Sequence, residues 1–232
     1  MPLIFPTHLF NPRGVKVWLA NSTVQSGQSL SGVIDVIRTD GGGLRMVEFS
    51  GIVLRTNDAI RAWEAWQAEL QAGASIATVP VFLNRYNPRP LQGSKPTRYG
   101  TLANQSDDPY FPEAAEYGAE MIKVNADAPA PFRSVQISVT MSQGSAIKGG
   151  ETFSIAHPTA GNHIYKVNRV LSRAGDNYTI KLDCPLREAL AGNEKLSFDV
   201  PKFDAHLMPD TDIALMLENY RSETSITFRE AL

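Results

Sequence analysis

The chain has 232 residues, of which 43% are hydrophobic and 20% are charged, a composition typical of a globular protein with a substantial core. Its formal charge of −2 gives no overall attraction to nucleic acid or anionic membranes, and no run approaches the ~18 consecutive apolar residues of a membrane span. The single cysteine, Cys184, excludes an intramolecular disulfide and a cysteine-based zinc site, and the proline-rich N-terminus predicts no signal peptide.

Short apolar runs with period-2 alternation, bounded by Gly, Asn, Asp and Pro, recur along most of the chain and predict strands. The first three are expected over residues 15–20, 30–39 and 44–56. The "DGGG" of residues 40–43 is expected to join the second and third as a hairpin turn, because glycine tolerates the positive φ of tight turns. Gly32 and Gly51 lie inside strand-like runs and indicate β-bulges or a close backbone approach.

One amphipathic helix is predicted over about residues 58–72, with Asn57 as its N-cap and Gly73 just beyond its end. Its apolar side carries Ala59, Ile60, Trp63, Trp66 and Leu70. Because the two tryptophans share this side with aliphatic residues, we expect them in the core. The alternative is that they are stacking platforms for bases or sugars.

After a strand over residues 75–83, residues 84–118 form a predicted loop rich in Pro, Asn, Gly and Tyr. Loops of this length inside compact domains are commonly functional. Tyr and Arg are enriched at protein interfaces, so this loop predicts protein contacts, with simple loop packing as the alternative. The candidate assembly-interface residues are Tyr86, Arg89, Tyr99, Tyr110, Phe111 and Tyr117.

The remaining sequence is again strand-like. Strands are expected over residues 119–124, 132–141, 213–220 and 225–232. Between them, residues 145–201 contain four short strands at regular spacing with glycine-rich turns, a pattern that predicts a small barrel or sandwich. The last strand is expected to pair into a sheet, because an unpaired apolar strand would be prone to aggregation.

No catalytic, metal-binding or cofactor-binding constellation is apparent in the sequence. Cys184 lacks the local signature of a nucleophile and is expected to be a buried, unreactive thiol. The glycines of "DGGG" and "KGGE" lack the context of a phosphate cradle and are interpreted as turns. Scattered histidines, expected to be structural, are His8, His157, His163 and His206. Loop carboxylates that match no calcium-loop spacing are Asp107, Asp108, Glu113 and Glu116.

Five stretches carry a resemblance to a known family: "GQSLSGVIDVIRTDGGGLRMVEFSGIVLR", "IRAWEAWQAELQAGASIATVPV", "DDPYFPEAAEYG", "IKGGETFSIAHPTAGNHIYKVNRVLSRAGDNYTIKLDCPLREAL" and "SITFREAL". Their order is strands, a Trp-containing helix, an aspartate–aromatic loop, a strand-rich block closing on "P-L-R", and a final aromatic strand ending in "E-A". The chain thereby resembles tailed-bacteriophage minor tail proteins of the tail-tip or distal-tail kind. It departs from the pattern at Glu151, where aspartate after a single glycine is expected, and at Glu113–Glu116, which replace a second "D-G" pair.

The resemblance implies a mainly β fold, a tail-tube-like β-sandwich with one flanking α-helix plus an inserted small β-barrel. The sandwich would comprise residues 1–141 and 204–232, and the barrel would comprise residues 142–203. The Trp-containing helix would close one face of the sandwich, and the barrel would lie on the outside of a ring.

The implied function is structural: a distal tail-like ring protein of a phage tail tip that links the tail tube to the tip or baseplate. The implied partners are other copies in a ring, with a hexamer favoured, and the tail tube, tape measure and tail-tip hub proteins. No enzyme activity, cofactor, membrane or sequence-specific nucleic acid is expected, and the location is the virion tail, assembled in the bacterial cytoplasm. The alternative is a carbohydrate- or oligonucleotide-binding β-module that uses the barrel and the aromatic loop.

Overall fold

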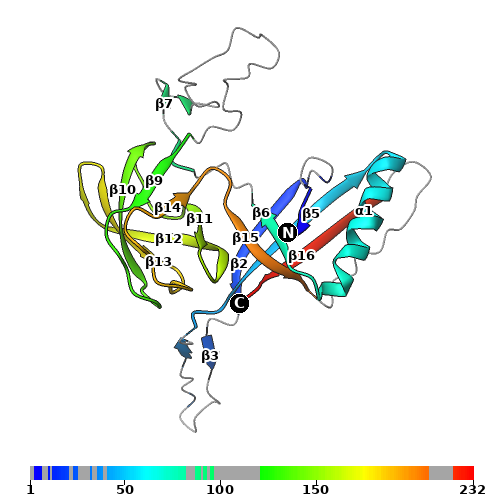
Figure 1. Cartoon of the computed structure of the whole chain (residues 1–232), viewed down its shortest axis with the longest axis horizontal. Helices are drawn as coiled ribbons and strands as arrows, with labels where there is room; N and C mark the ends of the chain where they lie inside the picture. Colours follow the sequence, from blue (N-terminus) through cyan, green and yellow to red (C-terminus); the bar gives the residue numbers. More distant parts are fainter. Residues whose placement is uncertain are drawn as a thin grey trace.

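The computed structural model describes residues 3–6, 10, 12–20, 23–25, 32, 36–38, 41–81, 87–89, 91–92, 95–96, 121–208 and 222–232. This described part is mainly β, with one α-helix, a six-stranded mixed sheet and a closed six-stranded antiparallel barrel (Figure 1). The sheet and the barrel lie side by side, and the helix covers the sheet. The expected fold class is confirmed.

The six-stranded sheet combines early and late parts of the chain. Its strand order is β1 (Leu3–Ile4), β6 (Ala77–Pro80), β15 (Lys202–Leu207), β16 (Ser222–Glu230), β5 (Leu44–Leu54) and β2 (Gly14–Ala20). Only β1 and β6 run parallel to each other; the other neighbours in this sheet are antiparallel. Because β15 and β16 return to this sheet, its core needs the end of the chain. The strand expected over 213–220 lies outside the described residues.

A β-bulge in β5 confirms the prediction made for Gly51. The register of β16 against β5 shifts between Thr224 and Ile226, so two residues of β5 oppose one of β16. Gly51 has a φ of 65°, in the left-handed region that favours glycine. The extra residue resets the side-chain alternation, which places one apolar set on the core face: Val47, Phe49, Ile52 and Leu54. Gly32 also has a positive φ, 79°, but its sequence neighbours lie outside the described residues.

The helix α1 (Asn57–Glu69) begins one residue earlier than the sequence predicts and is followed by the 3₁₀-helix η1 (Gln71–Gly73). Thr56, not Asn57, is the N-cap, because Thr56 keeps an extended backbone while its side-chain oxygen accepts a hydrogen bond from the Ala59 N–H at 3.2 Å. Gly73, with a φ of 96°, ends the 3₁₀ turn rather than the α-helix itself.

Both tryptophans of α1 are buried, which confirms their assignment to the core. The Trp63 ring lies edge-on to Phe10 with centroids 4.9 Å apart, and the Trp66 ring lies edge-on to Phe5 at 5.1 Å and to Phe228 at 6.0 Å. Such pairs contribute roughly 0.5–1.5 kcal/mol each beyond the area that they bury. The helix therefore closes one face of the sheet through an aromatic cluster.

The barrel is larger than the sequence predicts. Its closed strand order is β10 (Gln136–Gln143), β13 (Asn177–Leu182), β12 (Gly161–Ala174), β11 (Thr152–His157), β14 (Lys195–Ser197) and β9 (Lys123–Ala126). β9 and β10 complete the barrel by pairing with β14 and β13, whereas the expected boundary at residue 142 left β9 and most of β10 in the first domain. The boundary is corrected accordingly, because without these two strands the barrel cannot close.

This topology predicts how fragments of the chain behave. A fragment of residues 121–200 contains all six barrel strands and the whole barrel core, so we expect it to fold by itself. A fragment of residues 142–203 lacks β9 and most of β10 and leaves apolar strand edges unpaired, so we expect it to stay unfolded or to aggregate. Two-dimensional NMR spectra of the two fragments check this, and well-dispersed signals from the shorter one would show that the barrel does not depend on β9 and β10.

Two short ribbons complete the described strands. β3 (Thr23–Gln25) pairs with β4 (Val36–Arg38), and β7 (Leu91–Gln92) pairs with β8 (Lys95–Pro96). The expected hairpin between the second and third predicted strands is wrong for the described residues, because β4 pairs with β3 while β5 pairs with β2 and β16. Residues 41–43 instead connect the β3–β4 ribbon to the sheet and lie against the barrel, where a Cβ on Gly42 would overlap Pro185.

Candidate functional site

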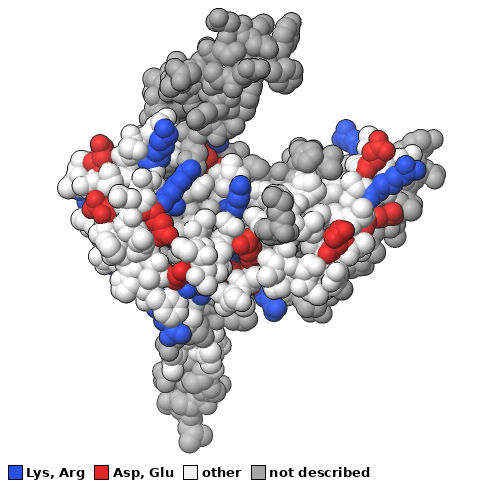
Figure 2. All heavy atoms as spheres, in the orientation of Figure 1, with Lys and Arg blue, Asp and Glu red and all other residues white. Residues whose placement is uncertain are grey.

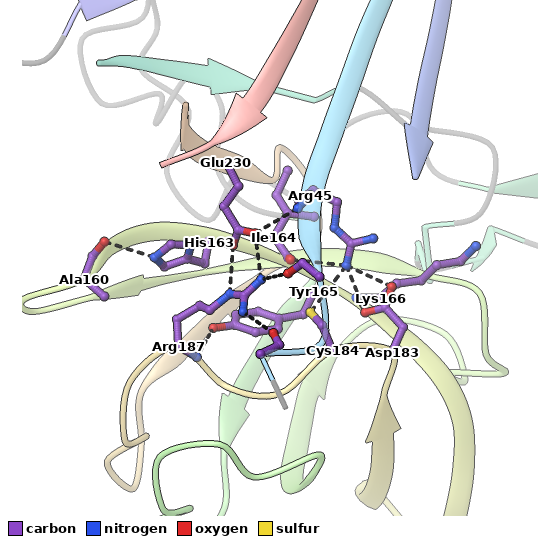
Figure 3. Close-up of polar contacts among 12 residues, drawn as sticks. Arg45, Ala160, His163, Ile164, Tyr165, Lys166, Asp183, Cys184, Arg187 and Glu230 are labelled. Atoms are coloured by element: carbon purple, nitrogen blue, oxygen red, sulfur yellow. Dashed lines mark hydrogen bonds and ion pairs between the residues drawn. The ribbon is translucent and has the colours of Figure 1, made fainter. Parts of the chain in front are cut away.

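A buried polar cluster joins the sheet to the barrel, with the Glu230 carboxylate at its centre (Figure 3). Its Oε1 accepts hydrogen bonds from His163 Nδ1 at 2.7 Å and from Arg187 Nε at 3.1 Å. Its Oε2 accepts from Arg187 Nη2 at 2.8 Å and from the backbone N–H of Arg45 at 2.9 Å. Both oxygens of this buried carboxylate are therefore fully used, as a buried charge requires.

Strand alternation places Glu230 and Arg45 in this cluster. Along β16, Ile226, Phe228 and Glu230 share one face, and the first two lie in the core of the sheet. Along β5, Arg45 occupies the same face as Val47 and Phe49. The apolar face of the sheet thus ends in two charged residues at the point where the barrel packs against it.

Arg187 connects the barrel to two other segments at once. It binds Glu230 through Nε and Nη2, and it donates from Nη1 to the Gly41 carbonyl and from Nη2 to the Gly43 carbonyl, both at 2.6 Å. A guanidinium suits this task because its donors form a rigid planar fork. The glycine run of residues 41–43 is therefore held by an arginine of the barrel.

A second ion pair strengthens the junction. The Nη2 of buried Arg45 lies 2.8 and 2.9 Å from the two carboxylate oxygens of Asp183. Asp183 also accepts the backbone N–H of Lys166 at 3.0 Å, which fixes it to β12. Burial acts to lower the pKa of Arg45, but the charge and hydrogen bonds of Asp183 together with the other neighbouring groups, Glu230 among them, raise that pKa, so the guanidinium stays charged.

Two histidines flank the cluster in different states. His163 contacts only acceptors, the Glu230 carboxylate and the Ala160 carbonyl at 3.0 Å, so its ring satisfies both contacts only as an imidazolium. Tyr165 Oη accepts the Arg187 backbone N–H at 2.9 Å and lies 2.8 Å from His157 Nε2. The partner of His157 is thus a neutral hydroxyl, and burial lowers the pKa of this histidine, which favours the neutral ring.

The pKa values of three groups at the junction are shifted from their ordinary values. Burial would raise the pKa of the Glu230 carboxyl, but hydrogen bonds from His163 and Arg187 hold it at about 2. Burial and then the charge of His163 lower the pKa of His157 to about 4. Cys184 is buried, as expected, and burial raises the pKa of its thiol to about 12.

Mild acid should therefore destabilise the protein through His157. The unfolded chain binds this proton near pH 6.5 and the folded chain only near pH 4, so the contribution is complete above pH 6.5 and is lost as the pH falls toward 4. We expect a loss of about 2 kcal/mol between pH 7 and pH 5 from this residue. Urea unfolding at the two pH values, compared with His157→Gln, measures it; an equal loss in the variant would contradict the neutral state of His157.

The cluster is built to hold two parts of the chain together. Its carboxylates and guanidinium groups are paired with each other, and the Cys184 thiol is held protonated.

Among the described residues no group of histidine, cysteine and acidic side chains is arranged to hold a metal ion. Within the same residues no helix is long and apolar enough to cross a membrane.

The residues singled out from the sequence have varied positions. Of the six candidate interface residues, only Arg89 is described, and it is half-buried; Tyr86, Tyr99, Tyr110, Phe111 and Tyr117 lie outside the described residues. His8 and the four loop carboxylates also lie outside the described residues.

Two other residues singled out from the sequence make structural contacts. His206 Nδ1 lies 2.9 Å from the Gly73 carbonyl. In the "KGGE" turn, Glu151 accepts the backbone N–H groups of Lys148 and Gly149, each at 2.7 Å.

Sequence reasoning missed four charged residues of the junction: Arg45, Asp183, Arg187 and Glu230. A signal was present for two of them, because Arg45 and Glu230 fall at core-facing positions of alternating strands, where a charge needs a partner. Arg187 and Glu230 also belong to the "P-L-R" and "E-A" segments that carry the family resemblance, and the structure brings these segments into contact.

Neither the protein-family models nor the curated proteins compared with this chain give a match.

Proposed function

We propose that this chain is a structural component of a phage tail tip, a distal tail-like ring protein that links the tail tube to the tip or baseplate. The observation that carries the proposal is the β3–β4 ribbon that projects from the body (Figure 1). Val24, Val36 and Ile37 on this ribbon are 60%, 56% and 66% exposed. A two-stranded ribbon is marginally stable alone, and exposed apolar strands pair with other chains, so the ribbon suits a contact between copies.

The junction supports this proposal because it fixes the barrel on the sheet. Besides the Glu230 and Arg45 pairs, Asp204 of β15 accepts the Thr78 hydroxyl at 2.6 Å and the Asn162 backbone N–H at 2.9 Å. Ile164 of the barrel strand β12 lies in the core of the sheet and helix. A protein that transmits contacts between neighbours in an assembly needs such a fixed arrangement.

The edges of the sheet are a further source of contacts. In the described part of the chain, β1 pairs only with β6 and β2 pairs only with β5. Two different free edges on one molecule allow head-to-tail contacts, and these form a ring when the rotation closes. On the family resemblance we propose a ring of six copies in the virion tail, in contact with the tail tube, tape measure and tail-tip hub proteins, with no catalytic role.

A carbohydrate- or oligonucleotide-binding module is the alternative, and the polar outer surface of the barrel favours it. Ser138 pairs with Thr179, and Thr140 donates to the side-chain oxygen of Asn177 at 2.8 Å. Such modules also use aromatic platforms or a basic groove, but the large aromatic ring exposed among the described residues is Phe132. Figure 2 shows acidic and basic side chains interspersed on the visible face, and a glycan array and single-stranded DNA test this alternative.

Sedimentation velocity tests the assembly proposal through the ribbon. We expect the wild-type chain to form one discrete large species and Ile37→Asp to shift it to monomer, because an aspartate opposes burial of the ribbon. The matched control is Leu171→Asp, which places the same charge at an exposed apolar position of the barrel strand β12 and should leave assembly intact. Equal behaviour of the two variants would mean that the ribbon is not an assembly contact.

A further inference from the structure

A cavity of about 290 Å³ opens on the surface at the junction of sheet and barrel. It lies beside the Glu230 cluster and is lined by barrel residues of the 132–133 and 185–187 segments together with Leu232. Small-molecule sites usually enclose about 300–1,000 Å³. The volume therefore suits one or two side chains of another protein better than a large ligand.

The rim of this cavity has the composition of a protein-binding surface. Phe132 is 56% exposed and Leu232 is 81% exposed. The Arg133 guanidinium lies over the Phe132 ring, 5.2 Å from its centroid. The backbone of Arg133 has a φ of 65°, in the left-handed region that residues other than glycine rarely adopt. Aromatic residues and arginine dominate the binding energy of protein interfaces, and a strained residue at a rim points to a functional position.

The charged side chains that line the cavity indicate which kind of partner binds there. Arg133, Arg187 and His163 line the cavity, and among the described residues of its lining there is no Asp or Glu. Glu230 lies behind Arg187 and His163, and its oxygens are already occupied by them. Among the described residues no carboxylate forms an ion pair with Arg133. A partner that complements this cavity therefore combines apolar side chains with a negatively charged group.

We infer that the segment Asp107–Glu113 of a second copy of this chain binds in this cavity. The segment reads "DDPYFPE", so it places two aromatic residues, Tyr110 and Phe111, between carboxylates. Residues 101–120 contain five carboxylates and no lysine or arginine. The aromatic rings fill the apolar cavity against Phe132 and Leu232, and a flanking carboxylate pairs with Arg133.

A segment of one copy that binds a cavity of the next copy gives the head-to-tail contact of a ring. The inference thus rests on the proposed assembly, since it names another copy as the occupant.

Peptide binding tests the cavity directly. The probe is an acetylated, amidated peptide of residues 106–115, titrated by calorimetry into the 232-residue chain carrying Tyr110→Ser and Phe111→Ser, so that its own segment does not compete. We expect saturable binding that Phe132→Ala or Arg133→Glu weakens at least about tenfold. The matched control is Arg173→Glu, because Arg173 lies over Tyr178 at 5.1 Å elsewhere on the barrel; it should bind normally. No saturable binding, or equal affinity in all variants, would overturn the inference.

Cross-linking tests the claim of a second copy. Benzoylphenylalanine is placed at position 132 in chains of natural isotope composition, which are mixed with ¹⁵N-labelled chains before irradiation. We expect mass spectrometry to find ¹⁵N-labelled peptides containing Tyr110 and Phe111 joined to position 132. Cross-links only within one chain would overturn the inter-copy contact. Because the peptide titration needs no ring, a failed assembly with successful peptide binding would reject the proposed function and keep the binding site.

Discussion

Replacing Glu230 with glutamine is expected to lower the free energy of unfolding by about 3–5 kcal/mol, since it leaves buried cations without their partner. Arg187 and His163 both contact this carboxylate and are themselves buried or nearly so. The substitution keeps the size of the side chain, so the loss reports the charge and its hydrogen bonds. Chemical denaturation monitored by tryptophan fluorescence measures it.

A matched carboxylate on the neighbouring strand is the control for this experiment. Glu48 of β5 pairs with Lys16 at 3.9 Å at the surface, and exposed ion pairs contribute about 0–1 kcal/mol. Glu48→Gln should therefore change stability little. If Glu230→Gln and Glu48→Gln had the same small effect, the polar cluster would not hold the barrel on the sheet.

Replacing Trp66 with alanine is expected to cost about 3–5 kcal/mol, because it empties the centre of the aromatic cluster between helix and sheet. The Trp66 ring contacts Phe5, Phe10 and Phe228. Trp63→Ala should cost a similar amount through its contact with Phe10. Thermal and urea unfolding of each variant check the size of the loss.

The exposed side of the same helix supplies the comparison. Arg61 and Glu64 are exposed, and substitutions at such positions typically change stability by less than about 1 kcal/mol. Arg61→Ala and Glu64→Ala should fall in that range. Comparable losses on the two sides of α1 would contradict the buried aromatic face.

Features set by local periodicity could be predicted from the sequence. The apolar face of α1 and the bulge at Gly51 follow from side-chain spacing and glycine chemistry within a few residues. The N-cap was misplaced by one position because Thr56 and Asn57 both suit it, and backbone geometry decides between them. The glycines at 42 and 43 do adopt positive φ, but their sequence does not reveal that an arginine 144 residues beyond Gly43 binds the carbonyl of that glycine.

Features set by distant contacts could not be predicted. Arg45 and Asp183 lie 138 residues apart in sequence, and nothing local pairs them. The start of the barrel was misplaced because β9 and β10 have the same alternation as the strands of the first sheet; only their pairing with β14 and β13 assigns them. Alternation specifies that a strand exists and which face is apolar, but not which sheet it joins.

Negative-stain electron microscopy of the purified 232-residue chain tests the proposed ring most directly. We expect class averages of closed rings with a central opening and one consistent rotational symmetry, and we expect Ile37→Asp to abolish them while Leu171→Asp preserves them. Particles that remain single copies at every concentration examined, in the wild type as in the variants, would contradict a ring-forming structural protein.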